Sequence, residues 1–540
     1  MGAELHVSAR QDHLRRLQRG AEERRRQAAV RELSAMPFDP RPMLPGDAYD
    51  AARRFAEASA ATLAPLHEPA ARAAELATQW AALLELGWPG MLVPEAQGGA
   101  GGTLLDLAAE VHTLSAEMAL LAGAAGLPAW LDAAPAWGGA APEAAFAALL
   151  AATRWTDPFR GTPWTAAEGI AQLGAWRVAE AERRRLVACT GMDVFKRDAM
   201  RRALGHHQGA PRMVFRASRA LALAGAAGGA VGIWAAVMPA GLPARAARAR
   251  VGLVRMEDGF VRSAGLGVHR APAASLVMDA SGIHYDPSAE SDLERLLAST
   301  EFDAALLSRA ARLRARLTAA GITKYNLTGA AALPPLPPGR RVILVPGQVE
   351  DDAAIRRGGG PLRSNLGLLR AVRAENPDAI LLWKPHPDVE AGMRRGRVPR
   401  AEAARLADHV LDRVPVAPLY ALAAEVHCLS SLTGFEALLR GLRVTCWGQP
   451  FYAGWGLTED RAPPPRRARR LSLDELVAGA LILHLRCRDP VTGLPCPPEV
   501  LLDRLATGAV APPAPPRLPA PIRALAARCS RLLAGLGARL

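Results

Sequence analysis

Three consecutive acidic residues follow an apolar segment in ILVPGQVEDDAAI (residues 343–355). Glu350, Asp351 and Asp352 carry like charges that repel one another at this spacing. A solvated surface loop would explain the triplet. A carboxylate that attacks carbon or accepts a proton during catalysis would also explain it, and other segments of the chain favour this second interpretation.

Two further acidic residues, Glu257 and Asp258, precede a glycine in RMEDGFVRS (residues 255–263), directly after an apolar segment. A carboxyl group beside a second carboxylate can have a raised pKa, as general acid-base catalysis requires. Glu257 is therefore the candidate acid/base, and Asp258 is the alternative.

Two segments could bind an anion. In WKPHPDV, two prolines exclude a helix around His386, and Lys384 supplies a cation. In SSLTGFEALLRG, Ser430 or Ser431 can cap a helix whose free N–H groups bind anions. Each segment alone is also consistent with an ordinary loop or helix cap. Four such motifs after successive strands predict one anion site lined with carboxylates.

Alternating strands and helices are expected to position these motifs. The predicted strands are VGIWAAV (231–237), RVGLVRM (250–256), SLVMD (275–279), RVILVPG (341–347), AILLWK (379–384), AEVHCLS (424–430) and LRVTCWG (442–448). Helical segments such as 291–299 and 364–375 separate many of them. This alternation predicts two parallel, doubly wound sheets joined by the Pro-rich linker 332–341. Ligands of such sheets bind beyond the carboxyl ends of the strands.

The composition indicates a folded protein with an anionic partner. The net charge is +14 and the sequence pI is about 10.4, which suits nucleic acid, a nucleotide-sugar or an acidic membrane face. No zinc-finger spacing and no aromatic RNA-binding signature occur, so nucleic acid is not expected. The six cysteines show no CxxC spacing, which fits a reducing cytoplasm and argues against a structural zinc. The charged N-terminus lacks the apolar core of a secretion signal.

One apolar run, residues 220–244, is long enough to cross a bilayer if it were one helix. It is rich in Gly and Ala, contains two prolines and has few large apolar side chains, so its insertion would be marginal. We therefore interpret 231–237 as a buried strand of a parallel sheet.

The N-terminal part of the chain has helical spacing with internal Gly and Pro stops. Its segment LELGWPGMLVPEAQGGAGGTLLDLAAEVHTLSAEMALLAG, within residues 82–123, resembles the N-terminal helical domain of acyl-CoA dehydrogenases. The β-domain and the C-terminal four-helix domain of those enzymes have no counterpart in the sequence, so a complete flavin site is not expected. A helical accessory domain without redox chemistry is favoured.

A second resemblance covers roughly residues 186–510. It rests on segments that occur in the family's order: MEDGFVRSAGLG (256–267), SLVMDASGIHYD (275–286), KYNL (324–327), VPGQVEDDA (345–353), WKPHPDV (383–389), HCLSSLTGFEALLRG (427–441) and WGQPFYAGWGLTED (447–460). They resemble the KpsC-like capsule polysaccharide family, bacterial retaining β-Kdo glycosyltransferases, where Kdo is 3-deoxy-D-manno-oct-2-ulosonic acid. One module is found here, and it resembles the C-terminal one of the family's usual two.

The resemblance implies transfer of Kdo from CMP-β-Kdo on a GT-B-like pair of Rossmann-type domains, with no cofactor or metal expected. The acidic loop resembles a Q-x-x-x-D pattern that begins at Gln348, which implies Asp352 as the nucleophile and Asp351 as the alternative. His386 and Lys384 resemble an "HP" element that holds the CMP phosphate.

The same resemblance implies further substrate-binding residues. Ser430 and Ser431 would donate hydrogen bonds to the CMP phosphate, reinforced by a helix N-terminus. Glu436 would bind the ribose hydroxyls of the cytidine, and Arg262 is a further candidate for substrate binding.

The predicted organisation has five parts. They are a basic flexible arm (1–47), a helical accessory region (48–185), an acceptor-side Rossmann-like domain (186–335), a CMP-sugar-binding Rossmann-like domain (336–510), and a Pro-rich linker with a basic amphipathic helix (511–540). The last helix, within 517–540, suits either an anionic inner-membrane leaflet or packing on the core.

We expect a cytoplasmic protein, peripheral on the inner membrane, with CMP-Kdo and a lipid-linked Kdo acceptor as partners. The alternative is a non-catalytic scaffold that docks the capsule export machinery.

Overall fold

The computed structural model describes residues 154–194, 196–207, 209–261, 273–324 and 333–508, with short strands at 111–113, 129–131 and 134–135. Two compact units divide the chain, namely Met1–Arg184 with His206–Gly209, and Arg185–Gly205 with Ala210–Leu540. The predicted N-terminal arm, Arg262 and the predicted C-terminal helix lie outside the described residues.

The first unit contains one long described helix and several short strands. Its elements are β1 (Val111–Thr113), β2 (Ala129–Leu131), β3 (Ala134–Pro135), β4 (Trp155–Thr156), β5 (Pro163–Trp164) and α7 (Ala166–Arg184). Strands β4 and β5 form an antiparallel pair, and Gly169 of α7 packs so closely on Trp155 that a Cβ would lie 1.9 Å from its ring. The structure therefore adds short strands to a region whose spacing predicted helices alone.

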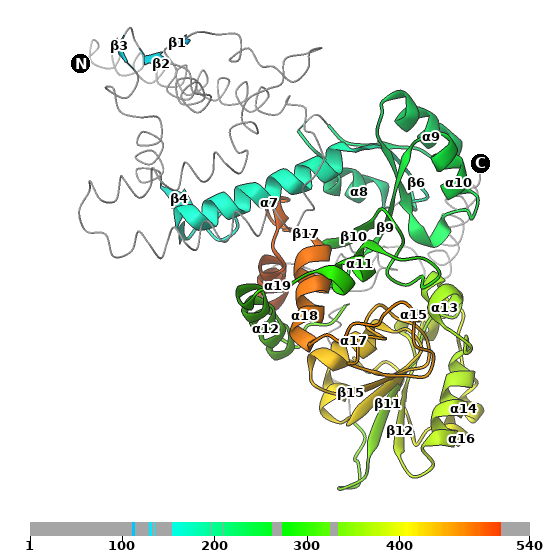
Figure 1. The fold of residues 1–540 in the computed structure, drawn as a ribbon. Helices are drawn as coiled ribbons and strands as arrows, with labels where there is room; N and C mark the ends of the chain where they lie inside the picture. The colour runs from blue at the N-terminus through cyan, green and yellow to red at the C-terminus, as the bar shows by residue number, and fades with distance from the viewer. Residues whose placement is uncertain are drawn as a thin grey trace, which may run out of the picture. The chain divides into compact units, whose positions relative to one another are not determined.

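The second unit contains two α/β halves, seen one beside the other in Figure 1. The first half has a seven-stranded sheet in the order β18-β17-β10-β9-β8-β6-β7. The strands of this sheet are β6 (Leu186–Thr190), β7 (Arg212–Met213), β8 (Ala230–Trp234), β9 (Gly252–Asp258), β10 (Ser275–Asp279), β17 (Arg486–Arg488) and β18 (Pro495–Cys496). Its helical segments are α8 (Arg197–Ala203), α9 (Ala217–Ala226), η2 (Ala235–Val237), α10 (Leu242–Arg248), α11 (Asp292–Ser299) and α12 (Ala304–Ala319).

The first sheet is mixed, so the prediction of a purely parallel sheet is wrong for this half. Strands β7, β6, β8 and β9 are parallel, but β10 runs antiparallel to both β9 and β17. Parallel neighbours need a crossover connection, usually a helix, and the sequence pattern placed no helix between the predicted strands at 250–256 and 275–279. The alternation of strands and helices, which predicts parallel pairing, therefore ends at β9 and gives no direction for β10.

The second half has a six-stranded, fully parallel sheet in the order β13-β12-β11-β14-β15-β16. The strands of this sheet are β11 (Val342–Pro346), β12 (Ile380–Lys384), β13 (His409–Val410), β14 (Glu425–Cys428), β15 (Arg443–Cys446) and β16 (Glu459–Asp460). Numbered along the chain, the order is 3-2-1-4-5-6, that of a Rossmann sheet, whose ligand crevice lies where the order reverses. Here that crevice is bounded by the loops after β11 and β14.

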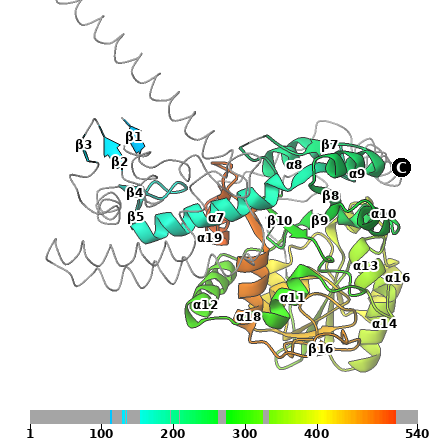
Figure 2. The same cartoon turned by 45° about the horizontal axis from the view of Figure 1, so that its top comes forward.

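Helices cover both faces of this second sheet. They are α13 (Ala353–Gly358), α14 (Asn365–Glu375), α15 (Pro387–Glu390), α16 (Arg400–Leu406), η4 (Ala417–Ala421) and α17 (Leu432–Leu439). Ile343 and Val345 of β11 pack toward α14 and α16, which lie side by side in Figures 1 and 2. Val342 and Leu344 belong to the core on the opposite face. This alternation follows from the period of two along a strand.

The chain then returns to the first half through α18 (Leu473–Val477) and the π-helical segment η5 (Ala478–His484). Strand β17 pairs with β10, and α19 (Pro498–Ala506) is tied to α12 by the ion pair between Arg309 Nε and Glu499 Oε1 at 2.7 Å. Residues 486–508, within the predicted second domain, thus complete the first sheet.

All seven predicted strands and both named helical segments are confirmed by strands β8, β9, β10, β11, β12, β14 and β15 and helices α11 and α14. The fold class, a GT-B-like pair of Rossmann-type domains, is confirmed with them. The apolar run at 220–244 divides between α9, β8, η2 and α10. Within the described ranges, no helix has the length and apolar character needed to cross a bilayer.

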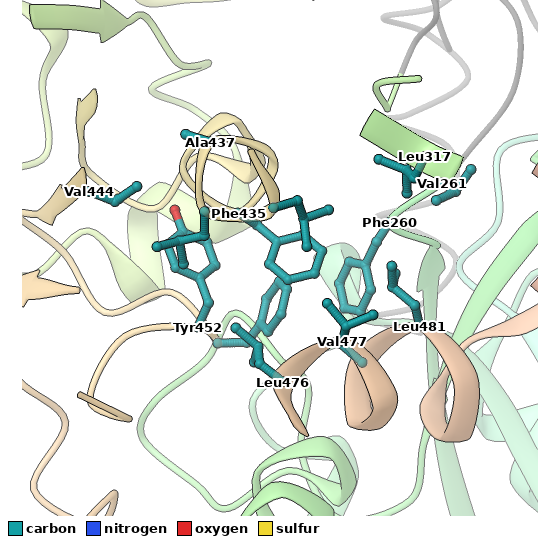
Figure 3. Packing of buried hydrophobic residues seen from close by; sticks show 14 of the residues in the cluster. Phe260, Val261, Leu317, Phe435, Ala437, Val444, Tyr452, Leu476, Val477 and Leu481 are labelled. Carbon is teal, nitrogen blue, oxygen red and sulfur yellow. The ribbon is translucent and has the colours of Figure 1, made fainter. Parts of the chain in front are cut away.

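One hydrophobic core joins the two halves of the second unit (Figure 3). Phe260, just after β9, stacks on Phe451 with ring centroids 4.5 Å apart, and Phe451 lies 5.1 Å from Phe435 of α17. Val477 and Leu481, from α18 and η5, are buried in the same cluster. This packing holds the end of β9 against the second sheet, which places the motifs of both halves near one another.

Candidate active site

Glu257 and Asp258 form the last two residues of β9. The next position, 259, has room only for glycine, because a Cβ there would lie 2.2 Å from Ser275 Oγ and 2.7 Å from Leu485. Burial raises the pKa of Glu257 to about 8 from its usual 4.5; the carboxylates of Asp258 and Asp352 raise it as well, and Lys196 opposes them. Glu257 therefore titrates near neutral pH, in the range that suits a general acid or base.

The three acids of the loop after β11 have separate partners. Glu350 accepts a hydrogen bond from the Asn365 N–H at 2.7 Å, which fixes the start of α14. Asp351 pairs with Arg394, whose Nε lies 3.2 Å from Oδ1. Asp352 caps α13 by accepting from the Ala354 N–H at 3.5 Å. Donors from three segments thus offset the repulsion that the triplet would otherwise create.

Asp352 of this triplet acts electrostatically on Glu257 of the first half and raises its pKa. The Asp352 side chain is 47% exposed, and its Oδ1 lies 3.5 Å from Nη2 of Arg394. Glu257 is half-buried and has a raised pKa, so it can exchange a proton near neutral pH beside the exposed, hydrogen-bonded Asp352.

Gln348 and Ser430 bind each other across the crevice of the second sheet. The Ser430 N–H donates to Gln348 Oε1 at 3.0 Å, and Gln348 Nε2 donates to Ser430 Oγ at 3.3 Å. Asn365 holds the same segment by exchanging hydrogen bonds with the Gln348 backbone at 2.9 and 2.7 Å. Gln348 therefore fixes the loop that carries Asp352, and its predicted contact with substrate stays a prediction.

Lys384, at the end of β12, lies inside the protein. Its Nζ donates to Glu390 Oε2 at 2.9 Å and to the Pro385 carbonyl, and its side chain is 6% exposed. Burial lowers the pKa of Lys384, while Glu390 opposes that shift. This buried ion pair competes with the predicted contact between Lys384 and a phosphate.

His386 caps α15 by accepting a hydrogen bond at Nδ1 from the Asp388 N–H at 3.1 Å. Burial lowers the pKa of His386 to about 3, and the cations Lys324, Lys384 and Arg394 lower it further. The ring is thus neutral at pH 7, with its proton on Nε2 because Nδ1 is the acceptor. His386 can donate a hydrogen bond to an anion but brings no positive charge.

Ser431 caps α17, as predicted, by accepting from the Thr433 N–H at 3.2 Å. Glu436, inside that helix, is buried; its Oε1 accepts from the Lys324 N–H at 2.7 Å and its Oε2 from the Tyr420 hydroxyl at 2.6 Å. Burial raises the pKa of Glu436. Its oxygens bind these internal donors, and its predicted contact with ribose stays a prediction.

Four side chains near these motifs were not assigned a role from the sequence: Lys196, Tyr285, Lys324 and Arg394. Lys196 pairs with Asp258 at 3.1 Å, and Arg394 binds Asp351 and Asp352. The Tyr285 hydroxyl is buried and has no hydrogen-bond partner among the described residues. Burial and the carboxylates of Glu257 and Asp352 hold the pKa of Tyr285 well above its usual range. Their signals in the sequence were slight. Tyr285 and Lys324 occur within segments that resemble the KpsC-like family, and Arg394 occurs in an ordinary basic run.

Within the described ranges, one cluster could hold a metal ion, namely Glu180, His206 and His207 of the first unit, whose ligand atoms lie within 4.8 Å of one another. Glu180 already accepts hydrogen bonds from both the backbone N–H, at 3.0 Å, and the ring of His207. An ordinary histidine–carboxylate pair accounts for this geometry, and we assign no metal to it.

Comparisons with known proteins agree with the two resemblances. Residues 230–488 match the model of a family described as capsule polysaccharide biosynthesis protein, and residues 47–138 match the acyl-CoA dehydrogenase N-terminal domain. These matches confirm the predicted resemblance to the KpsC-like capsule polysaccharide family and the predicted resemblance of the N-terminal part to acyl-CoA dehydrogenases.

Two curated relatives and one solved structure are each similar to part of this chain. The capsule polysaccharide modification protein LipA of Neisseria meningitidis serogroup A is 49% identical over 232 residues, which are 43% of this chain and 33% of that protein. The lipopolysaccharide-processing protein LpsZ of Rhizobium meliloti is 43% identical over 245 residues, which are 45% of this chain and 56% of that protein. The chain thus spans a third to about half of these relatives. A structure titled Thermosulfurimonas dismutans KpsC, beta Kdo 2,7 transferase, is 33% identical, with 60% of this chain and 99% of that one covered and a TM-score of 0.48.

Proposed function

We propose that this chain, whose residues 230–488 match the capsule polysaccharide biosynthesis family, is a retaining β-Kdo glycosyltransferase. It would move Kdo from CMP-β-Kdo to a lipid-linked or Kdo-terminated acceptor in capsular polysaccharide biosynthesis. One observation carries the proposal: Glu257 at the end of β9 has a pKa raised to about 8, and Asp352 at the start of α13 acts on it electrostatically. Retention by double displacement needs such a pair, a nucleophilic carboxylate and an acid/base.

In the first step, a carboxylate oxygen of Asp352 attacks C2 of Kdo, the anomeric carbon. The bond from C2 to the phosphate oxygen breaks, and CMP leaves with the electron pair, so no proton is needed for its departure. Lys324 and Arg394, both of which act electrostatically on His386, would offset the charge that builds up on the phosphate. His386 would donate a hydrogen bond from Nε2 to the same group.

In the second step, the Glu257 carboxylate accepts the proton of the acceptor hydroxyl, whose oxygen attacks C2. The ester bond to Asp352 breaks and its carboxylate is restored; two inversions retain the configuration. Asp352 carries no charge while it is esterified, so its contribution to the raised pKa of Glu257 disappears at that stage. The base would therefore ionise more readily when the acceptor needs it.

The proposed partners extend beyond the donor. A lipid-linked acceptor would require the enzyme at the anionic leaflet of the inner membrane, where a cytoplasmic protein with net charge +14 is attracted electrostatically. Docking to the capsule export machinery is proposed for the same location.

The test compares Asp352→Asn with Asp351→Asn, since both side chains contact Arg394 and both substitutions keep the shape. We expect Asp352→Asn to abolish CMP release in the presence of CMP-Kdo and a Kdo-primed acceptor, with CMP affinity unchanged. Asp351→Asn should retain substantial activity. The opposite pattern would move the nucleophile to Asp351, and a wild-type protein inactive with every Kdo acceptor would leave the scaffold function.

A further inference from the structure

Lys196 lies at the carboxyl edge of the first sheet, where it joins three strands. It follows β6 and is the N-cap residue of α8. Its Nζ lies 3.1 and 3.3 Å from the two oxygens of Asp258, at the end of β9. The same ammonium lies 4.2 Å from the ring centroid of Trp234, the last residue of β8. Cation, aromatic ring and carboxylate thus come from three strand ends.

The ends of β6 and β8 lie at the reversal of strand order in the parallel part of the sheet, and β9 is the next strand beside β8. β7 lies on one side of β6, and β8 and β9 lie on the other. Doubly wound sheets bind ligands beyond such a reversal, at the carboxyl ends of the strands. Lys196 and Glu257 therefore share the edge at which the first half is expected to meet a ligand.

The charges around Glu257 explain what a cation does at this edge. Asp258 on the same strand and Asp352 at the start of α13 are carboxylates, and the Tyr285 hydroxyl also lies within electrostatic range. Lys196 lowers the pKa of Glu257 against the two carboxylates, while Arg394 pairs with Asp352 and Arg357 acts on Tyr285. A proton acceptor beside two negative charges is unavailable at neutral pH unless a cation offsets them.

Stability alone is a weak reason for this contact. The side chains of Lys196 and Asp258 are 34% and 17% exposed, and partly exposed ion pairs contribute about 0–1 kcal/mol. A charge a few ångströms from a carboxyl group, in contrast, changes its titration by roughly 1–3 pKa units. The contact is thus better suited to adjusting a neighbouring carboxyl group than to holding the fold together.

We propose that Lys196 is a positioning residue of this site: it fixes Asp258 through both carboxylate oxygens and supplies the positive charge that lets Glu257 act as a base. The inference rests on the proposed function, in which Glu257 takes the acceptor's proton. Lys196 precedes the residues matched by the capsule family model, which begin at 230.

The test measures the protonation of Glu257 without turnover. Infrared difference titration of the full chain follows the C=O stretch of a protonated carboxyl group, and Glu257→Gln assigns the signal. Lys196→Met keeps an unbranched side chain of similar length and removes the charge, so the titration should move to higher pH by about one unit. Lys196→Arg should restore it. Arg314→Met removes a cation from a comparable, partly exposed pair with Asp474 and should leave the titration unchanged.

Transfer assays supply a second readout. At pH 7, a rise of one unit in the pKa of Glu257 reduces its ionised fraction by up to about tenfold, and by less once esterification of Asp352 has lowered that pKa. We therefore expect kcat for Lys196→Met to fall by up to about tenfold, while KM for CMP-Kdo stays unchanged. An unmoved titration in Lys196→Met, or failure of Lys196→Arg to restore it, overturns the inference. If wild type releases no CMP but the titration moves as described, the proposed function fails and the electrostatic role of Lys196 stands.

Discussion

Replacement of Glu257 by glutamine tests the charge balance of the site through protein stability. The folded protein holds the pKa of this carboxyl group at about 8, against 4.5 for an ordinary glutamate. Between these values the folded state binds a proton that the unfolded state releases, so stability falls as pH rises from about 4.5 to about 8. Glutamine keeps the shape and stays neutral, and the variant should escape this loss.

The size of the effect follows from the same values. At about 1.4 kcal/mol per pKa unit, the full difference corresponds to roughly 5 kcal/mol. Glu257 is only partly buried, and an effective dielectric constant of about 20 reduces the expressed difference to about 2–3 kcal/mol. Glu257→Gln should match wild type near pH 4.5 and exceed it by this amount at pH 8.5.

Thermal unfolding of the full chain between pH 4.5 and 9 measures this difference as a change in Tm. Glu499→Gln is a control of opposite sign, because its partner Arg309 helps to hold the pKa of Glu499 below its usual value. Glu499 contributes stability above pH 4.5 that disappears as pH falls, so Glu499→Gln should lower Tm at neutral pH and approach wild type in acid. A Glu257→Gln variant that follows wild type at every pH, or differs most in acid, would refute a buried carboxyl with a raised pKa.

Three other predictions follow from the loops after β12 and from the C-terminus. Lys384→Met should destabilise the protein by about 3 kcal/mol in denaturant unfolding because it leaves the largely buried Glu390 carboxylate without its cation. If Glu390 holds this ammonium in the complex as well, CMP affinity measured on the folded protein stays unchanged; a loss of CMP affinity would support the predicted contact between Lys384 and the phosphate. His386→Ala should weaken CMP binding by about 1–3 kcal/mol in calorimetry through loss of the Nε2 hydrogen bond, and unchanged affinity would remove His386 from the site. Truncation after Pro516 should lower sedimentation with phosphatidylglycerol vesicles and spare transfer to a soluble Kdo acceptor; an unfolded product would assign the helix to the core instead.

The strands that carry the motifs could be predicted from the sequence because each is a short apolar run bounded by turn residues. VILVP and ILLWK became β11 and β12, with every residue buried. The parallel arrangement brought the predicted loops to one edge of the second sheet, as the alternation with helices implies. The prediction failed at β10, where no helix separates two strands and the alternation gives no information on their direction.

Side-chain partners could not be predicted in the same way, because they depend on residues distant in sequence. Gln348 binds Ser430, 82 residues away, and Lys196 binds Asp258, 62 residues away. A motif identifies a residue type at a strand end, but competition among neighbours decides which group it contacts. Lys384 illustrates this, since the nearby carboxylate of Glu390 binds its ammonium.

The relation between Glu257 and Asp352 depends on packing between the two sheets as much as on the loops that carry them. Glu257 is held by β9, and Phe260 anchors the end of that strand by stacking on Phe451 at 4.5 Å. Asp352 is held by its cap on α13 and by Arg394. In double displacement, the separation of the two carboxyl groups decides whether one can attack carbon while the other reaches the acceptor. The aromatic contacts of Phe260 help to set that separation, while the raised pKa of Glu257 comes first from burial, then from Asp258, and to a smaller extent from Asp352. Under the proposed mechanism, esterification of Asp352 would remove the smallest of these three contributions.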